Sequence, residues 1–154
     1  MFQKKIIFLF LILLSSCGYE AIHSKKNSIN YSFSVSELTF IGDRTVNLKI
    51  KEKLNNYTQG KEDKDFTLKI SSSSENTILA KDTTGDTTAF KSIISINIEV
   101  LMNNKFKSNL TIIESFNYNN ISNKFDLKKY EKEIKNNLAE IATDKLIFKL
   151  SNIQ

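Results

Sequence analysis

The sequence predicts an α+β fold, a two-layer sandwich in which a four-stranded mixed sheet carries two helices on one face, in the order β-α-β-β-β-α. Four stretches alternate apolar and polar residues with the period of two that is typical of strands. Two further stretches repeat apolar residues every three or four positions, as amphipathic helices do. The first of these helices is short and lies between the first two strands. It therefore predicts a right-handed parallel crossover, with both helices on the same face of the sheet.

The N-terminal segment has the order of parts of a secretory signal peptide. Lys4 and Lys5 precede an apolar run from Ile6 to Leu14, which is much shorter than the roughly 20 residues that a membrane-spanning helix needs. A leucine, two serines and Cys17 then resemble the bacterial lipobox, in which the cysteine thiol is lipidated and the peptide is cut before it. We expect lipidation of Cys17 and a division into a signal peptide over 1–16, a lipidated tether over 17–30 and a folded domain over 31–154.

Composition narrows the classes of protein further. Cys17 is the only cysteine, so the domain has none for a disulfide or a cysteine-based zinc site. The formal net charge of the chain is +5, of which Lys4 and Lys5 contribute two charges. This mild excess of positive charge is compatible with binding to lipid phosphates. The sequence lacks the concentrated basic stripe of a nucleic-acid-binding protein, so no nucleic-acid partner is expected. Gly18 follows the cysteine where aspartate commonly signals inner-membrane retention, and we expect the periplasmic side of the outer membrane.

The first strand and helix are predicted from adjacent patterns. Residues 32–41 alternate as a strand, and a change of parity predicts a bulge near Glu37. Asp43 is suited to cap the helix that follows, and Gly60 is predicted to end it. The apolar residues expected on one face of this helix are Val46, Ile50, Leu54 and Tyr57.

Three strands are predicted after the first helix. The second begins near Asp65, and serines 71–74 fit either a strand with a solvated face or an exposed loop before the strand resumes at Ile78. Residues 83–86 have the composition of a turn, and the third strand begins near Thr88. Asn103 and Asn104 predict a type I′ turn, because asparagine tolerates positive φ. The fourth strand alternates through Phe106, Leu110, Ile112, Phe116 and Tyr118.

The last predicted element is a long amphipathic helix after the asparagine-rich residues 119–123. Lysines and glutamates occupy its other faces, as expected for a helix that lies on the surface of a sheet. Its expected apolar face consists of Leu127, Tyr130, Ile134, Leu138, Ile141 and Phe148.

Catalytic and metal-binding motifs are not recognised in the sequence. His23 is the only histidine, so a serine or cysteine triad or a site of several histidines is excluded by counting. The carboxylate pairs Asp63 and Asp65, and Glu131 and Glu133, fit the solvated faces of a loop and a helix better than acid–base chemistry. The four glycines are not clustered into a phosphate-binding loop. We expect a protein that is not an enzyme and needs no cofactor or metal.

Several short motifs occur in a characteristic order. They are the lipobox running into Cys17-Gly18-Tyr19, Asp43-Arg44 between a strand and a helix, Ala80-Lys81-Asp82-Thr83 before a turn, Glu114-Ser115-Phe116 at the end of a hairpin, and Lys145-Leu146 near the end of the last helix. Together these motifs resemble the LptE family of LPS-assembly lipoproteins, over nearly the whole chain.

The resemblance implies a non-enzymatic function. A member of this family sits as a plug inside the outer-membrane β-barrel LptD, helps that barrel to assemble, and contacts lipopolysaccharide on its way to the outer leaflet. The family's ligand contacts are attributed to basic residues near the turn before the hairpin and near the start of the last helix. The candidates here are Lys81, Lys91, Lys124 and Lys128, of which only Lys81 falls in a matching motif.

Two other classes of function fit the sequence less well. One is an outer-membrane lipoprotein of another interaction class, such as a secretion-system pilotin or an envelope scaffold. The other is a lipid-anchored hydrolase that uses carboxylates alone. For Lys91, Lys124 and Lys128, the plainer interpretation is that they are ordinary surface lysines that contact no ligand.

Overall fold

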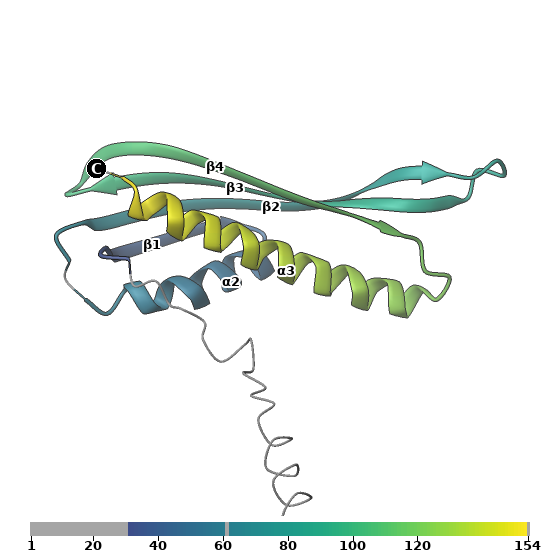
Figure 1. Ribbon diagram of the computed structural model, residues 1–154, viewed down its shortest axis with the longest axis horizontal. Helices are drawn as coiled ribbons and strands as arrows, with labels where there is room; N and C mark the ends of the chain where they lie inside the picture. Colours follow the sequence, from purple (N-terminus) through teal and green to yellow (C-terminus); the bar gives the residue numbers. More distant parts are fainter. Residues whose placement is uncertain (1–30, 61, 154) are drawn as a thin grey trace, which may run out of the picture. The chain divides into compact units, whose positions relative to one another are not determined.

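A computed structural model of the chain describes residues 31–60 and 62–153. The predictions for the signal peptide, the tether, Cys17 and His23 lie outside these residues. The described elements are β1 (Ser34–Gly42), α2 (Arg44–Leu54), the short 3-10 helix η2 (Asn55–Tyr57), β2 (Asp65–Lys81), β3 (Thr87–Met102), β4 (Lys105–Asn119) and α3 (Lys124–Ser151) (Figure 1).

The four strands form one sheet in the order β1-β2-β3-β4. The neighbours β1 and β2 are parallel, whereas the β2–β3 and β3–β4 pairs are antiparallel. Both helices lie on the same face, with α2 against β1 and β2 and α3 against β3 and β4 (Figure 1). The predicted two-layer α+β sandwich with a mixed sheet is therefore confirmed.

The core lies between the sheet and the helices because each strand turns alternate apolar side chains toward them. In β3 these side chains are Ile94, Ile96, Ile98 and Val100, each at most 1% exposed. Burying a side chain of this size contributes roughly 1.5–3 kcal/mol relative to leaving it in water. The uncovered face of the same strand carries Ser95, Asn97 and Glu99, so the sheet has one apolar face and one mostly polar face.

The entry into α2 is fixed by two residues. Gly42 has φ +98°, and a Cβ at this position would lie 1.8 Å from the backbone oxygen of Ser72, so only glycine allows β1 and β2 to approach here. Asp43 caps the helix, since its Oδ1 accepts the backbone N–H groups of Thr45 and Val46 at 2.9 and 3.1 Å. The predicted N-cap is confirmed.

The end of α2 differs from the prediction. The α-helix ends at Leu54, well before Gly60, and continues as η2. The N–H and the hydroxyl of Thr58 both donate to the Asn55 carbonyl, which closes the last turn. Tyr57 then stacks on Phe33 with ring centroids 4.5 Å apart.

The serine run is a strand rather than a loop, since β2 continues through it. The serines alternate like the other residues of β2, and the helix-facing pair makes polar contacts with α2 and its cap. Ser72 Oγ donates to Asn47 Oδ1 at 2.7 Å, and Ser74 Oγ donates to Asp43 Oδ2 at 2.6 Å. A polar stretch in β2 therefore binds the start of α2 through hydrogen bonds.

The asparagine turn and the bulge near Glu37 follow the prediction, but other register shifts do not. Asn103 and Asn104 have φ values of 52° and 59°, as a type I′ turn requires, and the β1–β2 register shifts between Val35 and Glu37. Shifts in the β2–β3 register on both sides of Ala80, and in the β3–β4 register between Val100 and Leu101, were not predicted. The shift next to Leu101 pairs this residue with Phe106 on the uncovered face, so Phe106 is 62% exposed and does not belong to the apolar face of β4.

The buried face of α3 is only partly the predicted one. Ile134 and Leu138 are buried, but Ile141 and Phe148 are 46% and 58% exposed, so their assignment to this face is wrong. The small residues Ala139, Ala142 and Thr143 are fully buried, and the predicted pattern of large apolar side chains did not include them. The buried residues of α3 are Ile134, Leu138, Ala139, Ala142, Thr143, Leu146, Ile147 and Leu150.

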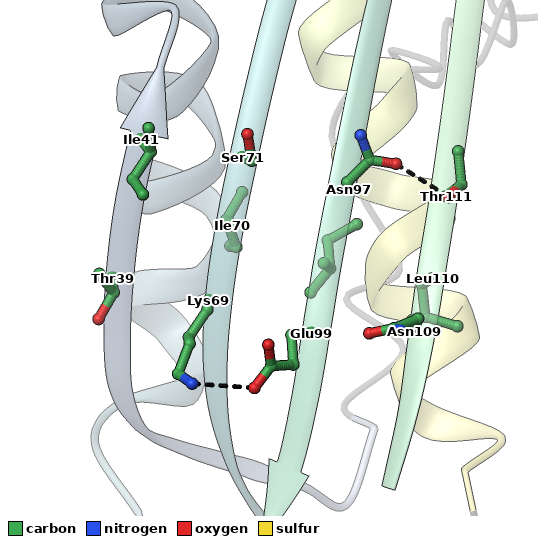
Figure 2. A pocket seen from close by; sticks show the side chains of 11 residues that line it. Thr39, Ile41, Lys69, Ile70, Ser71, Asn97, Glu99, Asn109, Leu110 and Thr111 are labelled. Atoms are coloured by element: carbon green, nitrogen blue, oxygen red, sulfur yellow. Dashed lines mark hydrogen bonds and ion pairs between the residues drawn. The ribbon is translucent and has the colours of Figure 1, made fainter. Parts of the chain in front are cut away.

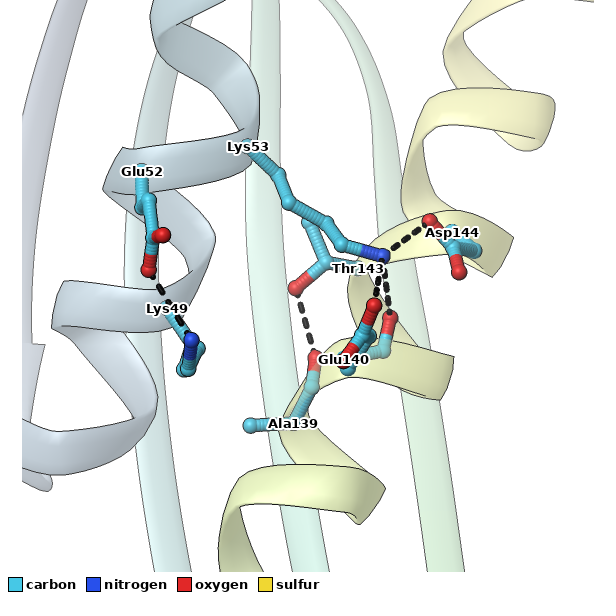
Figure 3. A network of polar contacts seen from close by, with 7 residues as sticks. All are labelled: Lys49, Glu52, Lys53, Ala139, Glu140, Thr143 and Asp144. Carbon is cyan, nitrogen blue, oxygen red and sulfur yellow. Dashed lines mark hydrogen bonds and ion pairs between the residues drawn. The ribbon is translucent and has the colours of Figure 1, made fainter. Parts of the chain in front are cut away.

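Ion pairs join the two helices to each other and to the sheet. Lys53 of α2 contacts Glu140 and Asp144 of α3 at 3.2 and 2.5 Å (Figure 3). Lys135 of α3 lies 2.9 Å from Asp43 Oδ2. Burial raises the pKa of Asp43, but hydrogen bonds from Ser74 and the Val46 N–H, together with the Lys135 ammonium, outweigh it and lower the pKa from 3.8 to about 2. Asp43 therefore connects α2, β2 and α3 as a carboxylate.

Candidate functional site

The candidate site lies at the end of the sheet that the helices cover least. β4 pairs with β3 only from Ala89 onward, so the β2–β3 hairpin extends beyond β4 by the Lys81–Thr87 pair and the turn that joins the two strands. We call residues 78–88 the distal arm. None of its side chains is buried, and Figure 1 shows the hairpin extending past the start of α3.

The turn of the distal arm is held by Asp82. Its Oδ1 accepts hydrogen bonds from the N–H and hydroxyl of Thr84 and from the N–H of Asp86, at 2.7 to 2.9 Å. The Thr84 hydroxyl, followed by the backbone N–H groups of the turn, lowers the pKa of Asp82. Gly85 supplies the positive φ of 92° that the turn needs. The turn predicted at residues 83–86 is therefore confirmed, and hydrogen bonds to the Asp82 carboxylate hold it.

The start of α3 is tied to the same end of the sheet. Asn120 donates its backbone N–H to the Thr88 carbonyl and its side-chain amide to the Thr87 carbonyl, both at 2.8 Å. Asn123 then caps α3 by accepting the N–H groups of Phe125 and Asp126. Residues far apart in the sequence, at the β2–β3 turn and the β4–α3 connection, therefore meet at one end of the sheet.

The four predicted lysines all belong to this end of the fold. Lys81 is the last residue of β2 and pairs with Thr87, and Lys91 lies opposite Thr77 on β3. Lys124 and Lys128 are one turn apart at the start of α3, and both are exposed. None of the four makes an ion pair with another residue in the described ranges. Their ammonium groups can therefore contact an external anion.

Exposed apolar side chains lie at the same end, and sequence analysis did not assign them to the site. Ile78 and Leu79 are 55% and 50% exposed, and Phe125 in the first turn of α3 is 75% exposed. The sequence signal for this exposure was the adjacent pair Ile78-Leu79. It places apolar side chains on both faces of the strand, whereas regular alternation would place them on one face only. This end of the molecule therefore combines cations with apolar surface.

The charge at this end is mixed rather than purely basic. Asp82 and Asp86 lie in the turn next to Lys81, and Asp126 lies between Lys124 and Lys128. A mixed surface gives no strong long-range attraction to a polyanion. It suits individual lysine–phosphate contacts better, since lysine binds phosphate as a point charge.

A shallow hollow lies on the uncovered face of the sheet (Figure 2). Its volume is about 490 Å³, and most of its lining side chains are polar. Lys69 pairs with Glu99 at 2.9 Å, and Thr111 Oγ1 donates to Asn97 Oδ1 at 2.9 Å. Its charges are compensated, and hydroxyl and amide groups lie beside apolar side chains such as Ile41, so the hollow can contact a surface that is partly polar and partly apolar.

In each of the two carboxylate pairs considered for acid–base catalysis, one member accepts a hydrogen bond from a nearby hydroxyl group. Asp65 accepts a hydrogen bond from the Ser34 hydroxyl at 2.8 Å, and Glu131 accepts one from the Tyr118 hydroxyl at 2.7 Å. Burial, followed by this contact with Glu131, raises the pKa of Tyr118. Within residues 31–60 and 62–153, no group of three or more acidic, histidine or cysteine side chains is placed to hold a metal ion. No helix among these residues is long and apolar enough to cross a membrane.

The fold and this end of the sheet define a small α+β domain with an exposed, mixed apolar and cationic tip. Solved structures that share this fold include three lipoproteins. Rare lipoprotein B from Shewanella oneidensis is 15% identical with a TM-score of 0.58 over 75% of this chain and 93% of that one. A minor lipoprotein from Acinetobacter baumannii is 8% identical with a TM-score of 0.61 over 79% and 91%.

The third structure is an uncharacterized lipoprotein B from Nitrosomonas europaea. It is 14% identical, with a TM-score of 0.59 over 79% of this chain and 86% of that one. The LptE-like fold that the sequence motifs predicted is therefore confirmed, and it is a fold of lipoproteins. No protein-family model matches the sequence, and no curated protein matches it either.

Proposed function

We propose that this protein is an outer-membrane lipoprotein, anchored through lipid on Cys17, that plugs the LptD β-barrel, helps it to assemble and contacts lipopolysaccharide without catalysis. The observation that supports this most is the shared fold, which extends over 86 to 93% of the length of three solved lipoproteins. The N-terminal motif at Cys17 supplies the anchor, and its several acyl chains would make the membrane attachment stable.

The distal arm and the start of α3 supply the proposed lipopolysaccharide contact. Lipopolysaccharide presents phosphates beside acyl chains, and this end presents Lys81 and Lys124 beside Ile78, Leu79 and Phe125. The lysines carry no competing ion pair among the described residues. The uncovered polar face of the sheet provides hydroxyl and amide groups for the lumen of a barrel.

The barrel partnership is tested by extraction of native membranes in mild detergent. Co-purification of the full chain with an outer-membrane β-barrel supports the proposal, and mass spectrometry of the purified protein should show acylated Cys17. Recovery as a free lipoprotein, or with components of a secretion system, contradicts the plug and favours a pilotin or an envelope scaffold.

The ligand contact is tested by reversing two charges. The double variant Lys81→Glu and Lys91→Glu should bind phosphorylated lipid A about tenfold more weakly at low salt, and the difference should shrink at high salt because exposed charges are screened. The double variant Lys51→Glu and Lys149→Glu is the matched control, since both are exposed lysines in the last turns of α2 and α3, away from the start of α3. Equal binding of lipid A by the wild type and the first double variant would show that Lys81 and Lys91 do not take part in ligand binding.

A further inference from the structure

One edge of the sheet is much less protected than the other. β1 is nine residues long and carries a bulge, whereas β4 is fifteen residues long. Proteins usually protect an open edge with charged side chains, proline or a bulge, because its free N–H and C=O groups can pair with another strand. In β4 the bulge and the two lysines, Lys105 and Lys107, occupy only the first few residues.

The rest of β4, residues 108–119, has little such protection. Proline is absent, and its one charged side chain, Glu114, is 14% exposed and paired with Lys145 of α3 at 2.6 Å. Ile113 and Phe116 in this segment are 61% and 46% exposed on opposite faces of the strand. An added strand would therefore find apolar contacts on both faces of the sheet.

An apolar groove runs beside this segment, between β4 and α3. Its volume is about 270 Å³, and Phe116, Tyr130, Ile134, Leu138 and Ile141 line most of it. Ile141 is 46% exposed, although it projects from a helix whose other face is buried. The groove can receive every second side chain of a strand paired with β4, since alternate side chains of a strand point to the same face.

Two polar residues, Glu133 and Asn137, complete the lining of the groove. Glu133 makes no ion pair with another residue among those described. Covering a carboxylate without pairing it is costly, so an occupant needs a cationic side chain at this point. Between residues 108 and 118 the helix-facing side of β4 has no cation and one carboxylate, Glu114. A second copy paired through β4 would therefore bring no cationic side chain to Glu133.

We propose that the exposed edge of β4 and the adjoining groove form a docking site for an extended strand of another protein, with alternating apolar side chains and one basic side chain facing Glu133. Main-chain hydrogen bonds to β4 supply the affinity, and the groove and Glu133 supply the specificity. This site does not include Lys81 of the distal arm, and it does not depend on the identity of the barrel partner proposed above.

The test uses two synthetic nine-residue peptides that alternate valine and threonine. One carries lysine in place of the central valine and the other carries glutamate. The full chain in detergent micelles should bind the lysine peptide about tenfold more tightly than the glutamate peptide. Binding should also slow hydrogen exchange of the β4 amides.

Two substitutions make the test specific. Glu133→Lys should invert the preference, so that the glutamate peptide binds more tightly, which a merely structural change would not produce. Ile141→Lys should weaken both peptides about tenfold, whereas Leu48→Lys, at a residue of α2 that is 55% exposed, should leave binding unchanged. Circular dichroism establishes that each variant is folded.

Several results would overturn the proposal. They are failure of both peptides to bind, equal binding of the two, binding without protection of β4, and the absence of any inversion in a folded Glu133→Lys variant. A wild-type dimer in sedimentation experiments that Ile141→Lys dissociates would assign the groove to a second copy of the chain.

Discussion

The helix-covered half of the sheet and the distal arm are built from the same strands, β2 and β3, but they bury very different amounts of surface. Ile96 on the covered half is completely buried, whereas Ile78 on the arm is 55% exposed. The difference arises from what lies above each isoleucine, since the helices cover one and no described element covers the other. Alternating apolar residues thus stabilise the fold in one region and form exposed surface in the other.

The largest expected difference concerns two glycines with positive φ. Gly42→Ala should lower the free energy of unfolding by about 4 kcal/mol, because the new Cβ would lie 1.8 Å from the Ser72 oxygen between β1 and β2. Gly85→Ala in the arm has no atom within 4 Å of its Cβ and should cost only about 1 kcal/mol of backbone strain. Urea denaturation measures both, and equal losses would contradict the comparison.

The second prediction compares the two isoleucines. Ile96→Ala should lower the free energy of unfolding by about 3 kcal/mol, because it leaves a cavity in the core. Ile78→Ala should change it by less than about 0.5 kcal/mol, since the side chain is already in water. Thermal unfolding of the two variants provides the measurement. A large loss of stability in Ile78→Ala would show that another part of the protein covers the arm.

The third prediction concerns pH. The folded-state pKa of Asp43 is lowered to about 2 from 3.8, so this carboxylate contributes stability that is fully present above about pH 4 and is lost as the pH falls toward 2. The contribution is about 2 kcal/mol. In Asp43→Asn, the fall in stability between pH 4 and 2 should be smaller by this amount. An unchanged acid profile would mean that Asp43 is not held as a carboxylate.

The smallest expected effect on stability is that of Lys81→Gln on the arm. Lys81 is exposed and makes no ion pair within the described ranges, so the free energy of unfolding should change by less than about 0.5 kcal/mol. Lipid A binding should nevertheless fall. Loss of stability together with binding would show that the arm supports the fold.

Parts of the candidate site could be predicted from local sequence. Lys81 next to a turn, and Lys124 after an asparagine-rich break, are recognisable without a structure. The apolar partners Ile78, Leu79 and Phe125 were not predicted to be exposed, because exposure depends on where α3 begins relative to the end of β2. The groove beside Glu133 was also missed, since its lining comes from α3 and from β4.

The sequence by itself determined the order of elements, the cap at Asp43, the asparagine turn and the bulge near Glu37, because these depend on residues close together in the chain. Tertiary structure decided three other features. It made the serine run a strand that contacts α2, it exposed Ile141 and Phe148 by packing α3 through small residues, and it left the edge of β4 open. These features depend on which surfaces meet across the fold, and contacts between distant residues leave no periodic pattern in the sequence.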